Sequence, residues 1–137
     1  MRLWHTNILP YLPRTQLLSQ KREIDLIWKD LANGKQTNHV LINYIWDYKN
    51  PKAELLIYYS ILEEEFKRRG YKFNRSQYIS CFEFEFEKRE PFSWHHDYTY
   101  LLQCYYNLEE KYMRGQKDFD DETFGKLVNF IFYGREN

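Results

Sequence analysis

The chain has 137 residues, with 20 lysines and arginines against 20 aspartates and glutamates, and 20% of its residues are aromatic. That length fits one domain with a real hydrophobic core, and a net charge of zero argues against a broadly basic nucleic-acid-binding protein. No apolar run is long enough to cross a membrane, and the first residues lack the apolar centre of a secretory signal. We therefore expect a soluble cytoplasmic protein formed by a single domain, residues 1–137.

The first thirteen residues are predicted to form an extended lead. They include Pro10 and Pro13, and a proline disfavours helical conformation in the residue before it. Trp4 and His5 are expected to pack this lead onto the helices that follow. The lead should then lie across the surface of a helical core.

Four helices are predicted from the spacing of apolar side chains. In the first, residues 14–31, apolar residues recur at intervals of three, four and seven, and Asn33-Gly34 supplies the end. The second begins near Pro51, which is favoured in a first helical turn, and ends near Gly70. The remaining two helices are predicted over residues 98–113 and 122–132.

Two segments are less regular. Residues 39–50 are compatible with a helix or with a loop. Residues 82–90 alternate with the period of a β-strand, but a lone strand has no partner, so we interpret them as an extended segment. The predicted fold class is mainly α: a small single-domain bundle of three or four helices with the extended N-terminal lead crossing them. Cys81 and Cys104 lack the spacing of a metal site or a disulfide framework, and both are expected to be buried as small hydrophobic residues.

Charge is unevenly distributed although it sums to zero. Residues 1–35 carry more lysines and arginines than acids, and residues 67–75 carry cations only. Acidic residues gather at 63–65, 82–87 and 118–122. This distribution is compatible with a basic face on one side of the molecule, of the kind that contacts DNA phosphates.

The start of the chain offers a reactive group. Because an arginine in second position is too long for the usual removal of the initiator, Met1 is expected to stay and to carry the free α-amine. Amines of this kind have a reference pKa of about 7.7–8.0, so part of their population is unprotonated and nucleophilic near neutral pH. If the lead crosses the first helix, the amine can meet Glu23, and the two form a compact pair of nucleophile and acid/base. The other interpretation of Glu23 is a solvated ion pair with neighbours such as Arg22.

Several motifs then occur in an order that is characteristic of one family. They are Arg2 at the chain start, Gln16 and Leu18 ahead of Arg22-Glu23, Ala-Asn-Gly-Lys at 32–35, KRRGYKFN at 67–74, His-Asp-Tyr at 96–98 and Leu-Glu-Glu-Lys at 108–111. In this order and approximate spacing the chain resembles the pyrimidine dimer DNA glycosylase family over most of its length.

The resemblance implies a small, mainly helical DNA repair enzyme with coupled glycosylase and abasic-site lyase activities. In that family the N-terminal amine attacks C1′ of the damaged nucleotide, displaces the base and forms an imine with the opened sugar, while a glutamate of the first helix assists proton transfer and β-elimination. Carried over by motif, Met1 supplies the amine and Glu23 the carboxylate. The residues expected to contact DNA are Arg2, Arg14, Gln16, Arg22, Lys35, Lys67 and Arg68. No cofactor and no metal are implied, and the expected partner is double-stranded DNA with damaged bases or abasic sites, bound by a monomer.

The chain also departs from the family pattern. The family nucleophile commonly belongs to a small residue exposed by removal of the initiator, and here Met1 stands in its place. The aromatic C-terminal tail is echoed only loosely by FIFYG at 130–134, and the net charge is neutral. These departures leave the preferred lesion open.

Other functions fit parts of the sequence. A duplex-binding module without catalysis would use basic side chains such as those of residues 67–69, and a protein-interaction domain would use exposed aromatic side chains. Binding that weakens steeply with salt would separate the first from the second. Metal binding would use His39, His95, His96 and Asp97, but adjacent histidines on a helix point apart and make a poor chelating pair.

Overall fold

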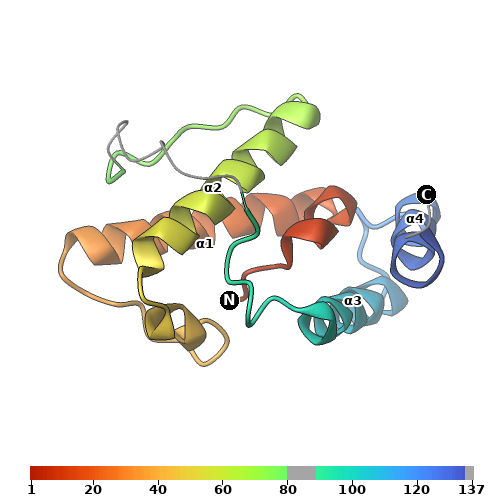
Figure 1. Cartoon of the computed structure of the whole chain (residues 1–137). Coiled ribbons are helices and arrows are strands. Elements are labelled where there is room, and N and C mark those ends of the chain that lie inside the picture. The colour runs from red at the N-terminus through yellow and green to blue at the C-terminus, as the bar shows by residue number, and fades with distance from the viewer. Residues whose placement is uncertain (80–88, 135–137) are drawn as a thin grey trace.

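The computed structural model describes residues 1–79 and 89–134, and within them four α-helices dominate (Figure 1). The helices are α1 (Arg14–Ala32), α2 (Pro51–Arg68), α3 (Tyr98–Met113) and α4 (Asp121–Phe132), with short 3-10 helices η1 (Thr6–Tyr11) and η2 (Asn43–Asp47) ahead of α1 and α2. No strand occurs in this described part of the chain. The mainly α fold class is confirmed, and each predicted helix agrees with the structure to within two residues.

α1 owes its position to an apolar stripe and to capping at both ends. Leu17, Ile24 and Ile27 are fully buried, which places one side of the helix in the core. The helix ends at a turn where Gly34 has a φ of 75°, a conformation that a residue without a Cβ adopts at little cost. At the other end Pro13 offers no capping side chain. The cap comes instead from Asp118, in the turn between α3 and α4.

α2 is buried on several sides, and three of its glutamates, Glu54, Glu63 and Glu65, are buried with it. Burial alone would raise the pKa of Glu54 and of Glu65, yet their arginine partners hold both pKa values below the usual range. The partners are Arg89 for Glu54 at 2.5 Å, Arg75 for Glu63 at 2.9 Å, and Arg68 and Arg69 for Glu65, the latter at 2.7 Å. Much of the positive charge of residues 67–75 therefore lies beside carboxylates of α2.

The lead lies against the helices as expected, but its predicted extended conformation is wrong for residues 6–11. These residues form η1, with Pro10 inside it. The φ to which a proline is fixed falls within the 3-10 range, and Pro10 removes only one weak hydrogen bond of a short helix. Buried Ile8 and Leu9 hold the segment to the core, and this tertiary packing outweighs the local preference. Trp4 and His5 are buried, as predicted.

The two irregular segments have different outcomes. Residues 39–50 contain η2, whose Ile45 is fully buried. The alternating segment 82–90 lies outside the described residues except for its last two positions, and Cys81 lies outside them as well. Cys104 is buried on α3, as expected. Among the described helices, none combines the length and apolar character that crossing a membrane requires.

α3 and α4 form the last part of the fold. Each begins with an aspartate cap: the Asp97 side chain accepts from the N–H of Tyr100 at 2.9 Å, and Asp120 accepts from Thr123 at 2.7 Å. α4 packs on α3 and on η1. Figure 1 shows the chain start near the middle of the molecule, close to α1, whereas α4 lies at the edge. Met1 is partly buried against the core, so the start of the chain packs on the rest of the fold.

Candidate active site

The chain starts beside a cavity of about 280 Å³. Its walls come mainly from the lead, α1 and α3. The α1 residues are spaced at i, i+3 and i+7 and the α3 residues at i and i+4, so each helix contributes one face. The lining residues are Met1, Arg2, Trp4, Gln16, Ser19, Glu23, Leu41, Asn107 and Lys111.

Four of the residues predicted from the sequence meet in this cavity: Met1, Arg2, Gln16 and Glu23. They are spread over the lead and two turns of α1, so the folding of the lead onto the helix brings them together. Three residues that carry an amine, a guanidinium and a carboxylate thus line one small space. These are the three groups on which the predicted imine chemistry depends.

Residues 2–4 are held by side chains from three helices. Gln20 of α1 is 1% exposed; its Nε2 donates to the Arg2 carbonyl at 2.9 Å and its Oε1 accepts the N–H of Trp4 at 2.7 Å. Two buried tyrosines bind the other carbonyls at 2.5 Å each, Tyr58 of α2 to Trp4 and Tyr100 of α3 to Leu3. The chain start is therefore part of the core, unlike the frayed ends of most domains.

The Arg2 side chain turns inward toward α3. Its guanidinium carbon lies 6.0 Å from the ring centroids of both Trp4 and Tyr100, within cation–π range. Burial raises the pKa of the Tyr100 hydroxyl, and the charge of Arg2 opposes part of that rise. Arg2 thus stands as a cation on the wall of the cavity, held by two aromatic rings.

Glu23 is half-buried and lines the cavity. Burial raises the pKa of Tyr58 well above its ordinary value, and the charges of Tyr100, Cys104 and Glu23 add to that rise. The Glu23 carboxylate is therefore close enough to act electrostatically on the tyrosine that holds the lead.

Gln16 forms a reciprocal amide pair with Gln116, at 2.7 Å and 3.1 Å. Gln116 lies in the turn between α3 and α4, so this pair ties the rim of the cavity to the C-terminal helices. With both its oxygen and one N–H engaged, Gln16 retains one N–H for a further acceptor.

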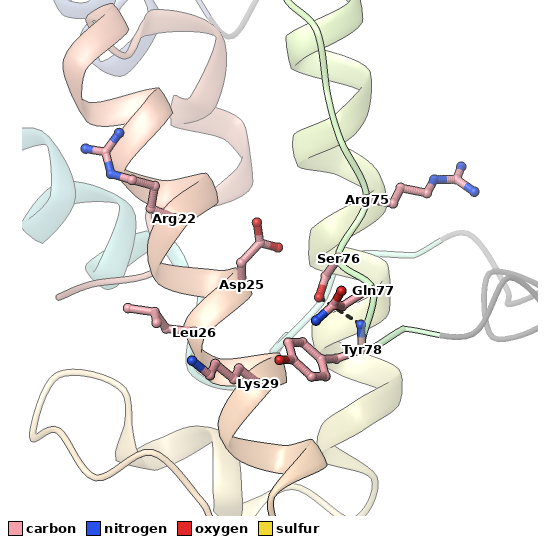
Figure 2. A pocket seen from close by; sticks show the side chains of 8 residues that line it. All are labelled: Arg22, Asp25, Leu26, Lys29, Arg75, Ser76, Gln77 and Tyr78. Atoms are coloured by element: carbon pink, nitrogen blue, oxygen red, sulfur yellow. Dashed lines mark hydrogen bonds between the residues drawn. The ribbon is translucent and has the colours of Figure 1, made fainter.

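Arg22 lines a different cavity. This larger one, about 570 Å³, lies between α1 and the segment 75–78 (Figure 2) and contains neither Met1 nor Glu23. In Figure 2 the Arg22 side chain points away from Tyr78. It donates to Ser19 Oγ at 2.9 Å, and Ser19 lines the smaller cavity. We place the candidate active site in the smaller cavity because Met1 and Glu23 both line it.

The other predicted DNA contacts do not surround the small cavity. Arg14 lies 5.3 Å from the ring centroid of Tyr71, at the start of α1. Lys67 and Arg68 are in the last turn of α2, and the adjoining Arg69 binds the Leu9 carbonyl at 3.0 Å, which places this turn against η1. Lys35, by contrast, follows the opposite end of α1 (Figure 1). The predicted cations therefore occupy both ends of the helix pair.

Sequence reasoning missed part of the cavity wall. Ser19, Leu41 and Asn107 were assigned no role, and Lys111 appeared only as a motif position. Asn107 and Lys111 are one turn apart on α3, a spacing that predicts a shared polar face. The spacing alone does not predict what this polar face contacts, because that depends on how α3 packs on the lead.

The histidines do not assemble a metal centre in the described ranges, where no group of three or more suitable ligands is found. His95 and His96 lie in the turn before α3, outside the helix predicted over residues 98–113. The His96 ring stacks on Tyr100 at 4.4 Å and its Nε2 is 2.5 Å from the Tyr44 hydroxyl. Burial, with His5 and His95 nearby, lowers the pKa of His96 to about 2, so this ring is a neutral part of the core.

Comparison with known proteins identifies the family of this chain. Neither the curated proteins nor the solved structures that were compared include a significant match. A family model described as pyrimidine dimer DNA glycosylase matches residues 1–79. This stretch holds the lead, α1 and α2, and with them Met1, Arg2, Gln16 and Glu23. Since the match covers more than half of the chain, the protein belongs to the pyrimidine dimer DNA glycosylase family.

Proposed function

We propose that the protein is a DNA glycosylase with coupled abasic-site lyase activity, in which the α-amine of Met1 is the nucleophile and Glu23 the acid/base group. It acts as an intracellular monomer on duplex DNA that contains pyrimidine dimers, other damaged bases or abasic sites. The observation that carries this proposal is the shared cavity of Met1, Arg2 and Glu23. The family to which the chain belongs supports the glycosylase step.

In the first stage the amine nitrogen forms a bond to C1′ of the damaged nucleotide. The bond between C1′ and the base nitrogen breaks, its electron pair leaves with the base, and the base takes up a proton. The amine loses a proton, and Glu23 is the nearby carboxylate that can accept it. The sugar ring then opens as O4′ takes a proton, which leaves a carbon–nitrogen double bond, the imine, between Met1 and C1′.

In the second stage a base removes a proton from C2′. The electron pair moves toward the imine, the C3′–O bond breaks, and the 3′ phosphate leaves with that bond pair. Water then hydrolyses the imine and returns the free amine. An amine and a carboxylate are sufficient for this sequence, because the imine itself serves as the electron sink.

The cations of the cavity fit the charge of the substrate. Arg2 and Lys111 lie on its walls, and guanidinium and ammonium groups are the usual partners of phosphate. C1′ of a stacked nucleotide is hard to reach, so the lesion is expected to be displaced from the helix; this costs a few kcal/mol, less where the base is damaged. Arg2 and Lys111 would then hold the phosphates on either side of the displaced nucleotide.

Borohydride trapping tests the proposal. The protein is incubated with duplex oligonucleotides that contain a pyrimidine dimer or an abasic site, and the mass of any covalent product is measured. The free protein should form one adduct whose linkage maps to Met1. A protein extended by one residue ahead of Met1 should lose the adduct, because misplacement of a reacting atom by about 1 Å can cost on the order of a hundredfold in rate.

The outcomes separate the alternatives. If the extended protein traps DNA as well as the native one, another amine such as Lys21 is the nucleophile. If neither form traps an abasic site while both bind duplex, the protein is a non-catalytic DNA-binding module.

A further inference from the structure

Gln20 makes an unusual set of contacts for a glutamine in the middle of a helix. Its Oε1 accepts the N–H of Trp4 at 2.7 Å, and its Nε2 donates to the Arg2 carbonyl at 2.9 Å. One side-chain amide therefore binds the backbone on both sides of Leu3, as a neighbouring strand would. The side chain is 1% exposed, so no water competes for these bonds.

The orientation of this amide is fixed by its partners. Exchanging the oxygen and nitrogen would set an N–H against the N–H of Trp4 and an oxygen against the Arg2 carbonyl. The hydroxyl of Tyr58 adds a further constraint, since its proton is shared between the Trp4 carbonyl at 2.5 Å and Oε1 of Gln20 at 2.8 Å. Only a neutral group with one acceptor and one donor satisfies all of these bonds.

Gln20 lies between two residues of the cavity wall on the same helix. Gln16 is one turn before it and Glu23 just under one turn after it, an offset along the axis of about 4.5 Å at 1.5 Å per residue. Gln20, which holds the backbone next to Met1, and Glu23, which lines the same cavity as Met1, thus belong to one helix. Their separation is set by helix geometry alone.

We propose that Gln20 is the positioning residue of the reacting amine: it docks the backbone of residues 2–4 on α1 and so fixes where the Met1 nitrogen stands relative to Glu23. The inference rests on the proposed function, in which that nitrogen is the nucleophile. Gln20 itself does not line the cavity and does not touch the substrate.

Gln20→Glu is the sharpest test, because it keeps the shape of the side chain and removes the donor. Ionised, the new carboxylate cannot donate to the Arg2 carbonyl; protonated, it can. Trapping of an abasic duplex by Gln20→Glu should be reduced about tenfold to a hundredfold at neutral pH. The ratio of variant to native trapping should rise as the pH falls from about 8 to about 5, where a buried carboxyl takes up its proton. Because a buried ionised carboxylate also destabilises the fold and this cost falls as it takes up a proton, circular dichroism at each pH must show that the variant is folded where its trapping is reduced.

The matched control is Gln103→Glu, the same chemical change at an exposed position of α3. It should trap like the native protein at every pH. Duplex affinity of Gln20→Glu should fall by no more than the loss of one phosphate contact, because Arg2 is the only proposed phosphate contact on the backbone that Gln20 docks.

A second measurement does not depend on catalysis. Hydrogen exchange of the Trp4 amide, followed by NMR, should be strongly protected in the native protein and should accelerate in Gln20→Glu under the same conditions. Native trapping by Gln20→Glu at neutral pH, or a Trp4 amide of the native protein that exchanges as in an unstructured peptide, would overturn the proposal. If Gln20→Glu does not fold, the native Trp4 exchange decides. If the native protein shows a protected Trp4 amide but never traps DNA, the docking stands and the proposed function falls.

Discussion

At the scale of single residues, Glu23 is the group whose chemistry can be removed with the least change in shape. Glu23→Gln keeps the side-chain volume but has no proton acceptor of comparable basicity. We expect strand scission at an abasic site to fall by about 10²- to 10⁴-fold, the usual contribution of a general acid/base group, while duplex affinity changes little. Gel assays of cleavage and equilibrium binding measure the two effects separately.

The control for that substitution is Glu122→Gln on α4, a carboxylate whose side chain is 78% exposed and far along the chain from the cavity. It should cleave at the native rate. Equal cleavage by Glu23→Gln and Glu122→Gln would remove Glu23 from the mechanism.

His96 allows a prediction on pH and stability. The unfolded chain takes up a proton at this ring near the reference pKa of 6.5, whereas the folded protein resists protonation down to a pKa of about 2. Between these values the unfolded state binds more protons, so the free energy of unfolding falls as the pH is lowered from about 7 toward 4. His96→Phe should flatten this dependence, at a cost of about 1 kcal/mol at neutral pH for the lost bond to Tyr44. Urea unfolding at several pH values checks both parts; an unchanged slope would contradict the assignment.

At the scale of elements, the start of α1 depends on a residue 103 positions later in the chain. Both the backbone N–H and the hydroxyl of Thr15 donate to Asp118 Oδ2, at 2.8 Å and 2.7 Å. Burial opposes ionisation of Asp118, but these hydrogen bonds hold its pKa below the usual value. The turn between α3 and α4 thus supplies the N-terminal cap that Pro13 lacks.

Asp118→Ala should therefore destabilise the protein by about 1 kcal/mol, the common value for a lost N-cap. Because the folded-state pKa of Asp118 is lowered, this stabilisation is present above the unfolded pKa and is lost as the pH falls through the folded value. Thermal unfolding at pH 7 and at pH 3 measures it. A deficit of equal size at both pH values would show that Asp118 acts through packing instead.

The elements show how far the sequence predicts the structure. α1 to α4 were predictable because apolar periodicity and end signals such as Asn33-Gly34 act locally. η1 was not, because the burial of Ile8 and Leu9 overrides the preference that Pro10 imposes. The cap by Asp118 and the lining by Lys111 were not predictable for a related reason: both join parts of the chain that only the tertiary packing brings together.

For the site, the sequence predicted which residues come together better than it predicted the charged surface. Met1, Arg2 and Glu23 follow from a motif whose members lie on the lead and one helix face, and they share a cavity. The basic face was predicted from the number of lysines and arginines in each segment, and such a count does not show which of them are paired with carboxylates. Arg68 and Arg69, for instance, lie against Glu65. All of the predicted DNA contacts, those of Arg14, Lys35 and Lys67 included, remain predictions.

At the scale of the whole molecule, this pairing of charges predicts a modest dependence of DNA binding on salt. Each phosphate neutralised contributes a slope of about 0.9 in log affinity against log salt. Lys111→Ala, which removes an ammonium from the cavity wall, should weaken duplex binding and flatten the slope by about that amount. Fluorescence anisotropy with a labelled duplex at several salt concentrations measures both.

Lys126→Ala is the matched comparison, since Lys126 is exposed on α4 and pairs with Glu122 at 3.4 Å. It should bind DNA with the native affinity and slope. If the two variants behave alike, Lys111 is not a phosphate contact and DNA approaches another face.

The hydrogen bonds that fix residues 2–4 also have a consequence for biosynthesis. Residues 2–4 are translated well before Tyr100, the residue whose hydroxyl binds the Leu3 carbonyl. A nascent or prematurely terminated chain therefore carries the amine without the pocket that aims it. Under the proposed mechanism, imine-forming reactivity toward DNA is expected to arise only after α3 has been synthesised and docked, and an incomplete product is expected to leave DNA uncut.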